Sequence, residues 1–504
     1  MAANPRPWRD QRVANLRVSK PRRKSILDPY ALELISARLN VPPEVAEEMF
    51  DRLVGPDYRR WEAQALRCGH CARPIRLQGR VVDGDGVEHF NTADEPDGVL
   101  KRCGNRRRSQ CPSCSFQYAG DMWRLLYAGL TGNSKGVPAT VASHPMTLVT
   151  LTAPSFGPVH STRVRDGRPR RCRPRRDGRP CSHGRPVSCM SIHDDGDPTL
   201  GTPLCGDCYD YTQAVLFNWW APELWRRFTV DLYRSLASSL GSSEAKLRRL
   251  VRISYAKVAE PQQRGVVHFH AIVRIDATGE GWHQPPTGVS VASLIDAVEQ
   301  ATRRARLTAQ SHHGELVSVR FGDQTDVQPI HQNADLLTGE LNPQKVAAYI
   351  SKYACKAPDD FGVSSRVIDA ATAEALGLSD HAIRMIQAAS DLSPLPGYQR
   401  LAAWTHSFGF RGHFSTHSRN YSTSLTALRT ARADHVRERA TGSASAAELV
   451  SEWRFAGVGY TTAGDAALAA KAEASARELR PYIREAAWEE GREPNDGQTP
   501  IDAD

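Results

Sequence analysis

Two histidines one residue apart stand inside an otherwise apolar run, "RGVVHFHAIVRID" at residues 264–276. Successive side chains of a β-strand point to opposite faces, so His268 and His270 leave the same face with their roots about 7 Å apart. From that spacing both imidazoles can reach one cation, and Glu260, at the end of the preceding strand of a hairpin, can supply a third ligand. The pattern predicts a divalent site with open coordination positions, suited to Mn²⁺ or Mg²⁺.

A second group of reactive side chains lies on an expected helix at residues 342–358, "NPQKVAAYISKYACKAP". Tyr349 stands three positions before Lys352, and Tyr353 stands three positions before Lys356. The chain holds ten lysines against 55 arginines, so lysines beside the tyrosines are a local concentration. A neighbouring ammonium can favour the phenolate and neutralise a phosphate oxygen. The helix therefore predicts a tyrosine nucleophile acting on a phosphate. The alternative is a helix that packs through its tyrosine rings.

All but one of the 11 cysteines fall in two stretches of the chain. Two CxxC pairs form the expected first zinc set: Cys68, Cys71, Cys111 and Cys114. The expected second set, within the Arg/Gly/Pro-rich segment 155–210, is Cys181, Cys189, Cys205 and Cys208. Spacing leaves four more candidates for these sites: Cys103, Cys172, His183 and His193. Structural zinc would order a segment that has no apolar core, whereas the alternative is scattered reduced cysteines.

The charge balance favours a polyanionic partner. The formal net charge is +9 with a pI near 9.0, and ten arginines lie between residues 163 and 185. Nucleic acid is expected ahead of a membrane surface. The arginines expected to contact DNA phosphates are Arg170, Arg171, Arg173, Arg175 and Arg176. No stretch approaches 18 consecutive apolar residues and the start lacks an apolar signal region, so we expect a cytoplasmic protein with no membrane partner.

These groups must be positioned by alternating strands and helices. Strands are expected at 146–154, 250–260, 266–276 and about 315–330, and helices at 31–53, 214–240, about 290–309 and 343–357. A tight hairpin among them favours an α+β fold over a doubly wound parallel sheet. The expected domains are a basic arm and helix at 1–60, a zinc-binding module at 61–120, a core at 121–360 with a zinc/Arg-rich insertion at 155–210, a core-flanking basic segment at 361–430, and a helical C-terminal region at 431–504 with a disordered acidic tail.

Three segments, in order, resemble the three motifs of the HUH endonuclease superfamily: "MTLVTLTAP", "GVVHFHAIVRID" and "VAAYISKYACK". The segments "CGNRRRSQCPSC" (103–114) and "GFRGHFSTHSRNYSTSL" (409–425) narrow the resemblance to rolling-circle replication initiators of actinobacterial plasmids and integrative elements. The resemblance covers roughly residues 103–430. It implies a central antiparallel sheet of the HUH-endonuclease type with flanking helices. The zinc-binding insertions and the helical N- and C-terminal extensions would be additions to that core.

The resemblance also implies a mechanism. His268 and His270 would hold a divalent ion that polarises the scissile phosphate, and Tyr349 or Tyr353 would attack, leaving a 5′-phosphotyrosyl link and a free 3′-OH. Two tyrosines one helical turn apart resemble the two-tyrosine branch of the superfamily, and which of them attacks first stays open. The implied activity is that of a metal-dependent, site-specific DNA endonuclease and strand transferase that starts and ends rolling-circle replication.

Origin DNA, single-stranded or supercoiled, is the expected partner. The chain has no GxxxxGK[ST] loop, so a host helicase is expected to unwind the DNA and a host polymerase to extend the 3′ end. Two alternatives stay open. A conjugative relaxase or single-strand transposase would share the chemistry, whereas a non-enzymatic, zinc-dependent nucleic-acid-binding regulator would bind DNA without cleaving it.

Overall fold

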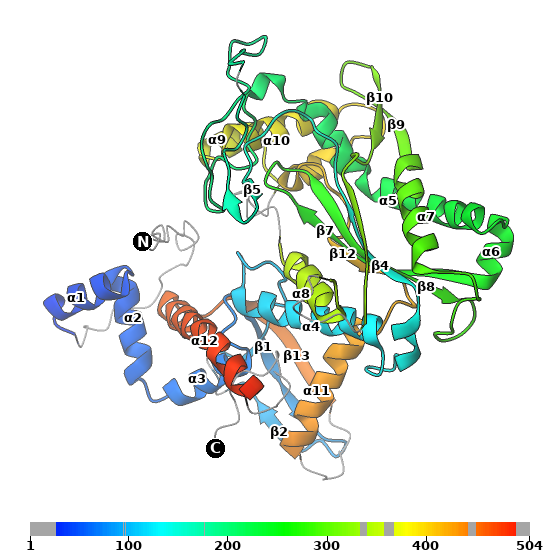
Figure 1. The fold of residues 1–504 in the computed structure, drawn as a ribbon. Helices are drawn as coiled ribbons and strands as arrows, with labels where there is room; N and C mark the ends of the chain where they lie inside the picture. The colour runs from blue at the N-terminus through cyan, green and yellow to red at the C-terminus, as the bar shows by residue number, and fades with distance from the viewer. Residues whose placement is uncertain are drawn as a thin grey trace. The chain divides into compact units, whose positions relative to one another are not determined.

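The computed structural model describes residues 27–93, 95, 97–175, 177–332, 340–356, 367–441 and 450–489. The chain forms two compact units, one made of residues 1–118 with 438–504 and the other of residues 119–437 (Figure 1). The expected zinc-binding module and the expected C-terminal region therefore fall in the same unit. Most of the basic arm, nearly all of the acidic tail and Arg176 lie outside the described residues.

A five-stranded antiparallel sheet is the centre of the larger unit, in the order β11-β4-β8-β7-β12. Its strands are β4 Met146–Leu151, β7 Val251–Pro261, β8 Val267–Ala277, β11 Thr325–Pro329 and β12 Ser415–His417. The antiparallel sheet and the mixture of helix and strand confirm the α+β prediction. The strand that carries the histidine pair, β8, lies in the middle of the sheet with a paired neighbour on each side.

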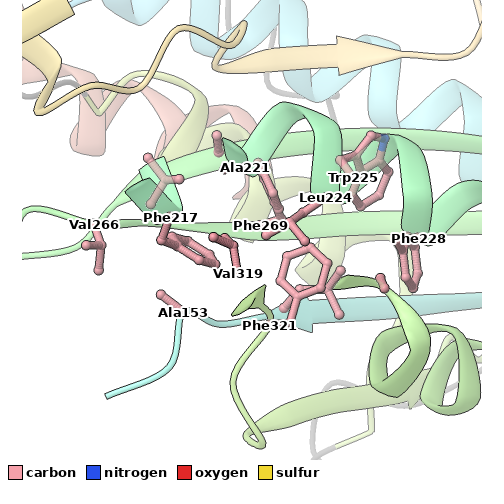
Figure 2. Packing of buried hydrophobic residues seen from close by; sticks show 14 of the residues in the cluster. Ala153, Phe217, Ala221, Leu224, Trp225, Phe228, Val266, Phe269, Val319 and Phe321 are labelled. Atoms are coloured by element: carbon pink, nitrogen blue, oxygen red, sulfur yellow. The ribbon is translucent and has the colours of Figure 1, made fainter. Parts of the chain in front are cut away.

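A long helix, α5 Tyr211–Ser239, packs an aromatic face against this sheet (Figure 2). Trp225 lies on Phe269 with ring centroids 5.6 Å apart, and Phe217 lies 6.3 Å from Phe321. The side chains of β8 on this face are buried: Val267, Phe269, Ala271, Val273 and Ile275. Burial of this face fixes the position of the histidines, because a slip of β8 by one residue would turn them into the apolar core.

The remaining helices of this unit are α6 Glu244–Leu250, α7 Val291–Arg304, α8 Pro343–Ala354, α9 Ala370–Ala375, α10 Asp380–Leu392 and α11 Leu425–Thr441, together with α4 Pro112–Thr131, which begins in the other unit. The helices expected at 214–240, 290–309 and 343–357 correspond to α5, α7 and α8. In the described part of the insertion, regular structure is limited to the two-residue strands β5 Val164–Arg165 and β6 Arg168–Pro169 and one short 3₁₀ turn.

The single strand expected at about 315–330 is two strands, because the chain turns at Gly322. β10 Leu316–Arg320 pairs with β9 Arg306–Gln310, while β11 pairs with β4 in the main sheet. A Cβ added at Gly322 would lie 2.8 Å from the carbonyl oxygen of Ala153. The close approach of the two backbones therefore requires a residue without a side chain.

The unit made of residues 1–118 and 438–504 joins segments from both ends of the chain. Its helices are α1 Pro29–Leu39, α2 Pro43–Val54, α3 Tyr58–Arg67 and α12 Ala463–Glu489, and its strands are β1 Ile75–Val82, β2 Glu88–Asn91, β3 Val99–Lys101 and β13 Val450–Val458. The helix expected at 31–53 is two helices, because Asn40 is left-handed (φ 52°) and Pro43 begins a new helix. No helix in the described part of the chain is long and apolar enough to cross a membrane.

Candidate active site

Three expected metal ligands meet on the face of the sheet opposite α5. In the β7–β8 hairpin, Glu260 lies directly opposite His268, and Val258 lies opposite His270. Cross-strand partners share a face, so all three polar side chains project together. The Oε2 atom of Glu260 lies 2.6 Å from Nε2 of His268 and 2.9 Å from Nε2 of His270. The hairpin therefore offers two nitrogens and one oxygen within 4.8 Å of one another.

Two neighbours orient the imidazole rings. The Oγ1 atom of Thr150, on β4, lies 3.1 Å from Nδ1 of His270. The side-chain Nε2 atom of Gln262 lies 3.1 Å from Nδ1 of His268, because the Oε1 atom of the same amide accepts from Arg264 at 2.9 Å. With both Nδ1 atoms engaged, both Nε2 atoms face the carboxylate. Thr150 can accept from Nδ1–H of His270, as the outer partners of histidine ligands do, whereas the amide nitrogen of Gln262 can only donate to Nδ1 of His268.

The carboxylate at the centre is buried and ionised. Burial alone would raise the pKa of the Glu260 carboxyl, but contacts with His268, His270 and Lys356 hold that pKa well below its usual range. Burial also lowers the pKa of the His268 imidazole, so the ring is neutral at neutral pH. A charged oxygen donor beside a neutral nitrogen donor is the protonation state that a divalent cation requires.

Helix α8 carries the two tyrosines beside these ligands and packs against β7 (Figure 1). Its start is fixed by Asn342, whose Oδ1 atom accepts from the backbone N–H of Lys345 at 2.9 Å, and by Pro343 at the first helical position. The apolar side of the helix is buried: Val346, Ala347, Ile350 and Ala354. The tyrosine side is thereby turned toward the histidines.

Both tyrosines contact the same histidine. The rings of Tyr349 and Tyr353 each lie 5.0 Å from the ring of His270, and 4.7 Å from each other. Tyr353 is nearly parallel to the imidazole (27°), whereas Tyr349 meets it edge-on (81°). Burial raises the pKa of Tyr349, so this phenol is protonated at neutral pH and needs nearby positive charge to react.

Two lysines supply positive charge at this point. The Nζ atom of Lys356 lies 2.6 Å from Oε1 of Glu260 and 4.6 Å from the ring centroid of Tyr353. The Nζ atom of Lys352 lies 5.9 Å from the same ring. The structure therefore brings together the three expected metal ligands, both expected nucleophiles and both expected lysines.

Four cysteines gather in the unit formed by the two ends of the chain: Cys71, Cys103, Cys111 and Cys114. The Sγ atom of Cys71 lies 3.7 Å from that of Cys111 and 3.6 Å from that of Cys114, and Cys103 and Cys114 are 3.7 Å apart. Zinc–sulfur bonds of about 2.3 Å in a tetrahedron place sulfur atoms about 3.8 Å apart, so the group could bind zinc. Cys68, expected in this set, lies outside it at the end of α3, where its Sγ lies 3.2 Å from the carbonyl oxygen of Ala65. Cys103 occupies the fourth position instead.

The expected second set divides between two groups. One group is Cys181, His183, Cys205 and Cys208, and the other is His160, Cys172, Cys189 and His193. In the first, Nδ1 of His183 lies 3.2 Å from Sγ of Cys208. Cys189, expected beside Cys205, instead has its Sγ 3.3 Å from Nε2 of His193. Each group offers four nitrogen and sulfur donors, the number found in structural zinc sites, and could bind zinc.

The arginines expected to contact DNA lie on the surface of the insertion. Arg170, Arg171, Arg173 and Arg175 are exposed. Three other polar residues beside the ligands were not found from the sequence: Thr150, His160 and Gln262. Thr150 was missed because its contact with His270 depends on the register of β4 on β8. His160 was missed because it stands twelve residues before Cys172, which is not a recognisable ligand spacing.

The comparisons with known proteins cover both units. A family profile described as "Replication initiator protein, pSAM2" matches residues 57–474. A replication initiator protein of Streptomyces ambofaciens is 40% identical over 449 residues, which is 86% of this chain and 93% of that relative. No solved structure matches the chain. The profile covers the hairpin, the tyrosine helix and all three Cys/His groups, and the chain belongs to the replication initiator protein family described for pSAM2.

Proposed function

We propose that this protein nicks one strand of origin DNA through a 5′-phosphotyrosyl intermediate and rejoins strands, to start and end rolling-circle replication of a plasmid or integrative element. One observation carries the proposal. Both tyrosines of α8 lie against His270, which shares the carboxylate oxygen of Glu260 with His268. A nucleophile and a set of divalent-cation ligands on adjoining elements are the parts that the HUH endonuclease chemistry requires.

The reaction is a phosphoryl transfer at one backbone phosphate. The phenol oxygen of Tyr349 or Tyr353 forms a bond to phosphorus while the bond from phosphorus to O3′ breaks. The phenol gives up its proton, and the departing 3′ oxygen takes one to become a hydroxyl. The strand on the 3′ side of the nick stays joined to the protein through its 5′-phosphate, so attack by a 3′-OH on the phosphotyrosine reverses the step and seals a strand.

The donor set fits Mg²⁺ or Mn²⁺. Two imidazole nitrogens and one carboxylate oxygen occupy one side of the site, and oxygen from a phosphate suits the remaining positions. When bound, such an ion would polarise the scissile phosphate and offset the charge that develops on it. Lys356 holds Glu260 from its other oxygen, and Lys352 adds positive charge beside Tyr353.

Other parts of the chain would be ordered by zinc and would hold the DNA. We assign structural zinc to the four-cysteine group and to the group of Cys181, His183, Cys205 and Cys208. The exposed arginines of the insertion would contact phosphates, with an affinity that falls as salt rises. The free 3′-OH would prime a host polymerase, and a host helicase would unwind the duplex.

A denaturing gel that detects covalent protein–DNA adduct tests this function. Full-length protein would be incubated with single-stranded DNA from the element that carries the gene, with Mn²⁺, Mg²⁺ or chelator. The variants are Tyr349→Phe, Tyr353→Phe and the double variant His268→Ala with His270→Ala, with Tyr30→Phe, an exposed tyrosine, as matched control. We expect adduct with wild type and control and none with the histidine variant. Adduct should also be lost when the tyrosine that attacks first is replaced by phenylalanine.

Binding of the same DNA, measured in parallel, separates the alternatives. If DNA from the whole element is bound but no adduct or nick forms with either metal, the protein is a non-enzymatic regulator and the proposal fails. Adduct that survives when Tyr349→Phe and Tyr353→Phe are combined in one chain would also contradict it, because another residue would then be the nucleophile.

A further inference from the structure

An exposed arginine-rich loop in the insertion is closed at its base by two potential metal ligands. We call residues 161–171 the arginine hairpin. Its two strands, β5 and β6, pair over only two residues each, and one further backbone bond joins Arg170 N–H to the carbonyl oxygen of Arg163. His160 stands immediately before the hairpin and Cys172 immediately after it. So short a ladder is a weak support by itself.

The two flanking residues meet Cys189 and His193 in one group. Nδ1 of His160 lies 3.2 Å from Nε2 of His193, and Sγ of Cys189 lies 3.3 Å from the same nitrogen. Tetrahedral zinc with bonds of about 2.0 and 2.3 Å to nitrogen and sulfur separates two nitrogens by about 3.3 Å and nitrogen from sulfur by about 3.6 Å. The donor atoms are therefore already spaced for one zinc ion.

The Nδ1 side of the His193 ring is turned away from the other three residues of this group. Its Nδ1 atom lies 2.5 Å from Oδ2 of Asp197, a carboxylate that can only accept. Asp197 is itself fixed, since Oδ1 accepts from the hydroxyl and backbone N–H of Thr199 at 2.7 and 2.8 Å. The other ring nitrogen of His193, Nε2, therefore faces a sulfur and another imidazole. A carboxylate behind a histidine is the arrangement that orients zinc ligands in proteins.

We propose that a zinc ion is bound at the base of the arginine hairpin by four residues: His160, Cys172, Cys189 and His193. The insertion then holds two zinc ions, one here and one at the group that contains Cys181. The ion at the base clamps both ends of the hairpin, while backbone bonds between Arg173 and Cys189 hold the following segment. An irregular loop is thereby ordered without an apolar core.

The charge of the clamped hairpin indicates which kind of partner it binds. Five arginines on it are exposed: Arg163, Arg165, Arg168, Arg170 and Arg171. A single acidic residue, Asp166, lies among them. A rigid loop with this charge fits the phosphate backbone of DNA, and this part of the inference rests on the proposed function.

Zinc content of the full-length protein tests the site directly. The double variant His160→Ala with His193→Ala would be compared with wild type by mass spectrometry of the bound metal. The matched control is His283→Ala with His313→Ala, two exposed histidines outside the Cys/His groups. We expect the first variant to carry one zinc ion fewer per chain than wild type and control. An unchanged zinc content would overturn the proposal.

A milder variant keeps the test decisive if the double variant does not fold. Asp197→Asn retains all four ligands but removes the carboxylate behind His193. In competition with a chelator, one zinc ion should be released at a chelator concentration 10 to 100-fold lower than the concentration that wild type requires. Release of every zinc ion at the wild-type chelator concentration would contradict the site.

The DNA part is tested separately on a duplex of arbitrary sequence at several salt concentrations. Arg168→Gln with Arg170→Gln should keep the full zinc content and reduce the slope of log affinity against log salt by about 0.9 for each phosphate that the variant no longer neutralises. The zinc-deficient variant should also bind more weakly. If it loses zinc but binds DNA as wild type does, the clamp has no role in DNA binding. The zinc measurement does not depend on nicking. If the protein does not nick DNA, the zinc ion at the base of the arginine hairpin is still expected.

Discussion

Glu260 and Lys356 form an ion pair that joins the β7–β8 hairpin to the end of helix α8. Their Oε1 and Nζ atoms lie 2.6 Å apart, while the other carboxylate oxygen faces both histidines. The two oxygens of one buried carboxylate thus have different partners. Through this residue, the position of α8 and the electrostatics of the ligand group depend on each other.

Removal of the lysine charge should slow nicking more than it weakens DNA binding. Lys356→Met keeps the length of the side chain but deletes the partner of Glu260. Hydrogen bonds to charged groups contribute about 1.5 to 3 kcal/mol, so we expect adduct formation to slow by about 10 to 100-fold. Single-turnover adduct assays would measure this, with Lys352→Met as the comparison because its Nζ is farther from the tyrosine ring. Equal effects of the two substitutions would contradict the prediction.

Metal affinity should respond to the residue behind His268. An ion on Nε2 of His268 requires the proton on Nδ1, but the nearest atom of Gln262 is an amide nitrogen, because its oxygen accepts from Arg264. Gln262→Glu places an acceptor against both Nδ1–H and the guanidinium. We expect the Mn²⁺ concentration for half-maximal adduct formation to fall by about tenfold, and to change much less in Gln262→Leu, which removes the amide without supplying an acceptor. Equal shifts in the two variants would show that an acceptor at this position has no such role.

The stability of the protein should depend on one buried amide of α5 that holds the start of strand β8. Asn218 is fully buried, and its side chain donates to the carbonyl oxygens of Gly265 and Phe408 and accepts from the N–H of Val267, all at 2.9 to 3.0 Å. Asn218→Leu leaves these groups unpaired, so we expect a loss of about 3 kcal/mol in the free energy of unfolding. Urea denaturation checks this, with Ser238→Ala, at an exposed position of the same helix, as control. A loss below about 1 kcal/mol would mean that water replaces the amide.

The sequence predicted the β7–β8 hairpin because its determinants are local. A short turn between two apolar runs sets the register, and alternation then places His268 and His270 on the polar face opposite Glu260. The tyrosine helix was equally readable, because Asn342 followed by Pro343 is a usual start of a helix. Its contact with the histidines was implied by the resemblance alone, since no local pattern places α8 against β7.

The membership of the Cys/His groups and strand β13 could not be assigned in the same way. In an insertion without periodicity, spacing does not say which cysteines share an ion, and Cys189 pairs with His193 through loop geometry alone. Cys103 replaces Cys68 for the same reason. Strand β13 was missed because its partner, β1, lies more than 350 residues earlier in the chain.

A lysine buried in the apolar core is the basis of the last prediction. Lys257 lies on the α5 face of β7, with its Nζ 4.3 Å from the ring centroid of Phe269 and 5.3 Å from that of Trp225. Burial lowers its pKa to about 7. In the unfolded chain the pKa is about 10.4, so between these values the unfolded state binds the proton and the folded state does not. Stability therefore rises with pH across this window and is lowest, and constant, below about pH 7.

Lys257→Met should remove that cost and so stabilise the protein most at low pH. A lysine pKa lowered by roughly three units corresponds to about 4 kcal/mol, which is the largest gain expected below pH 7, and the gain should shrink toward zero near pH 10. Urea denaturation at pH 6.5, 8 and 9.5 would measure it. Lys246→Met, at an exposed position of α6, is the matched control and should change little at any of these pH values. A gain that does not vary with pH would mean that Lys257 stays charged in the folded protein, held by its contacts with the two aromatic rings.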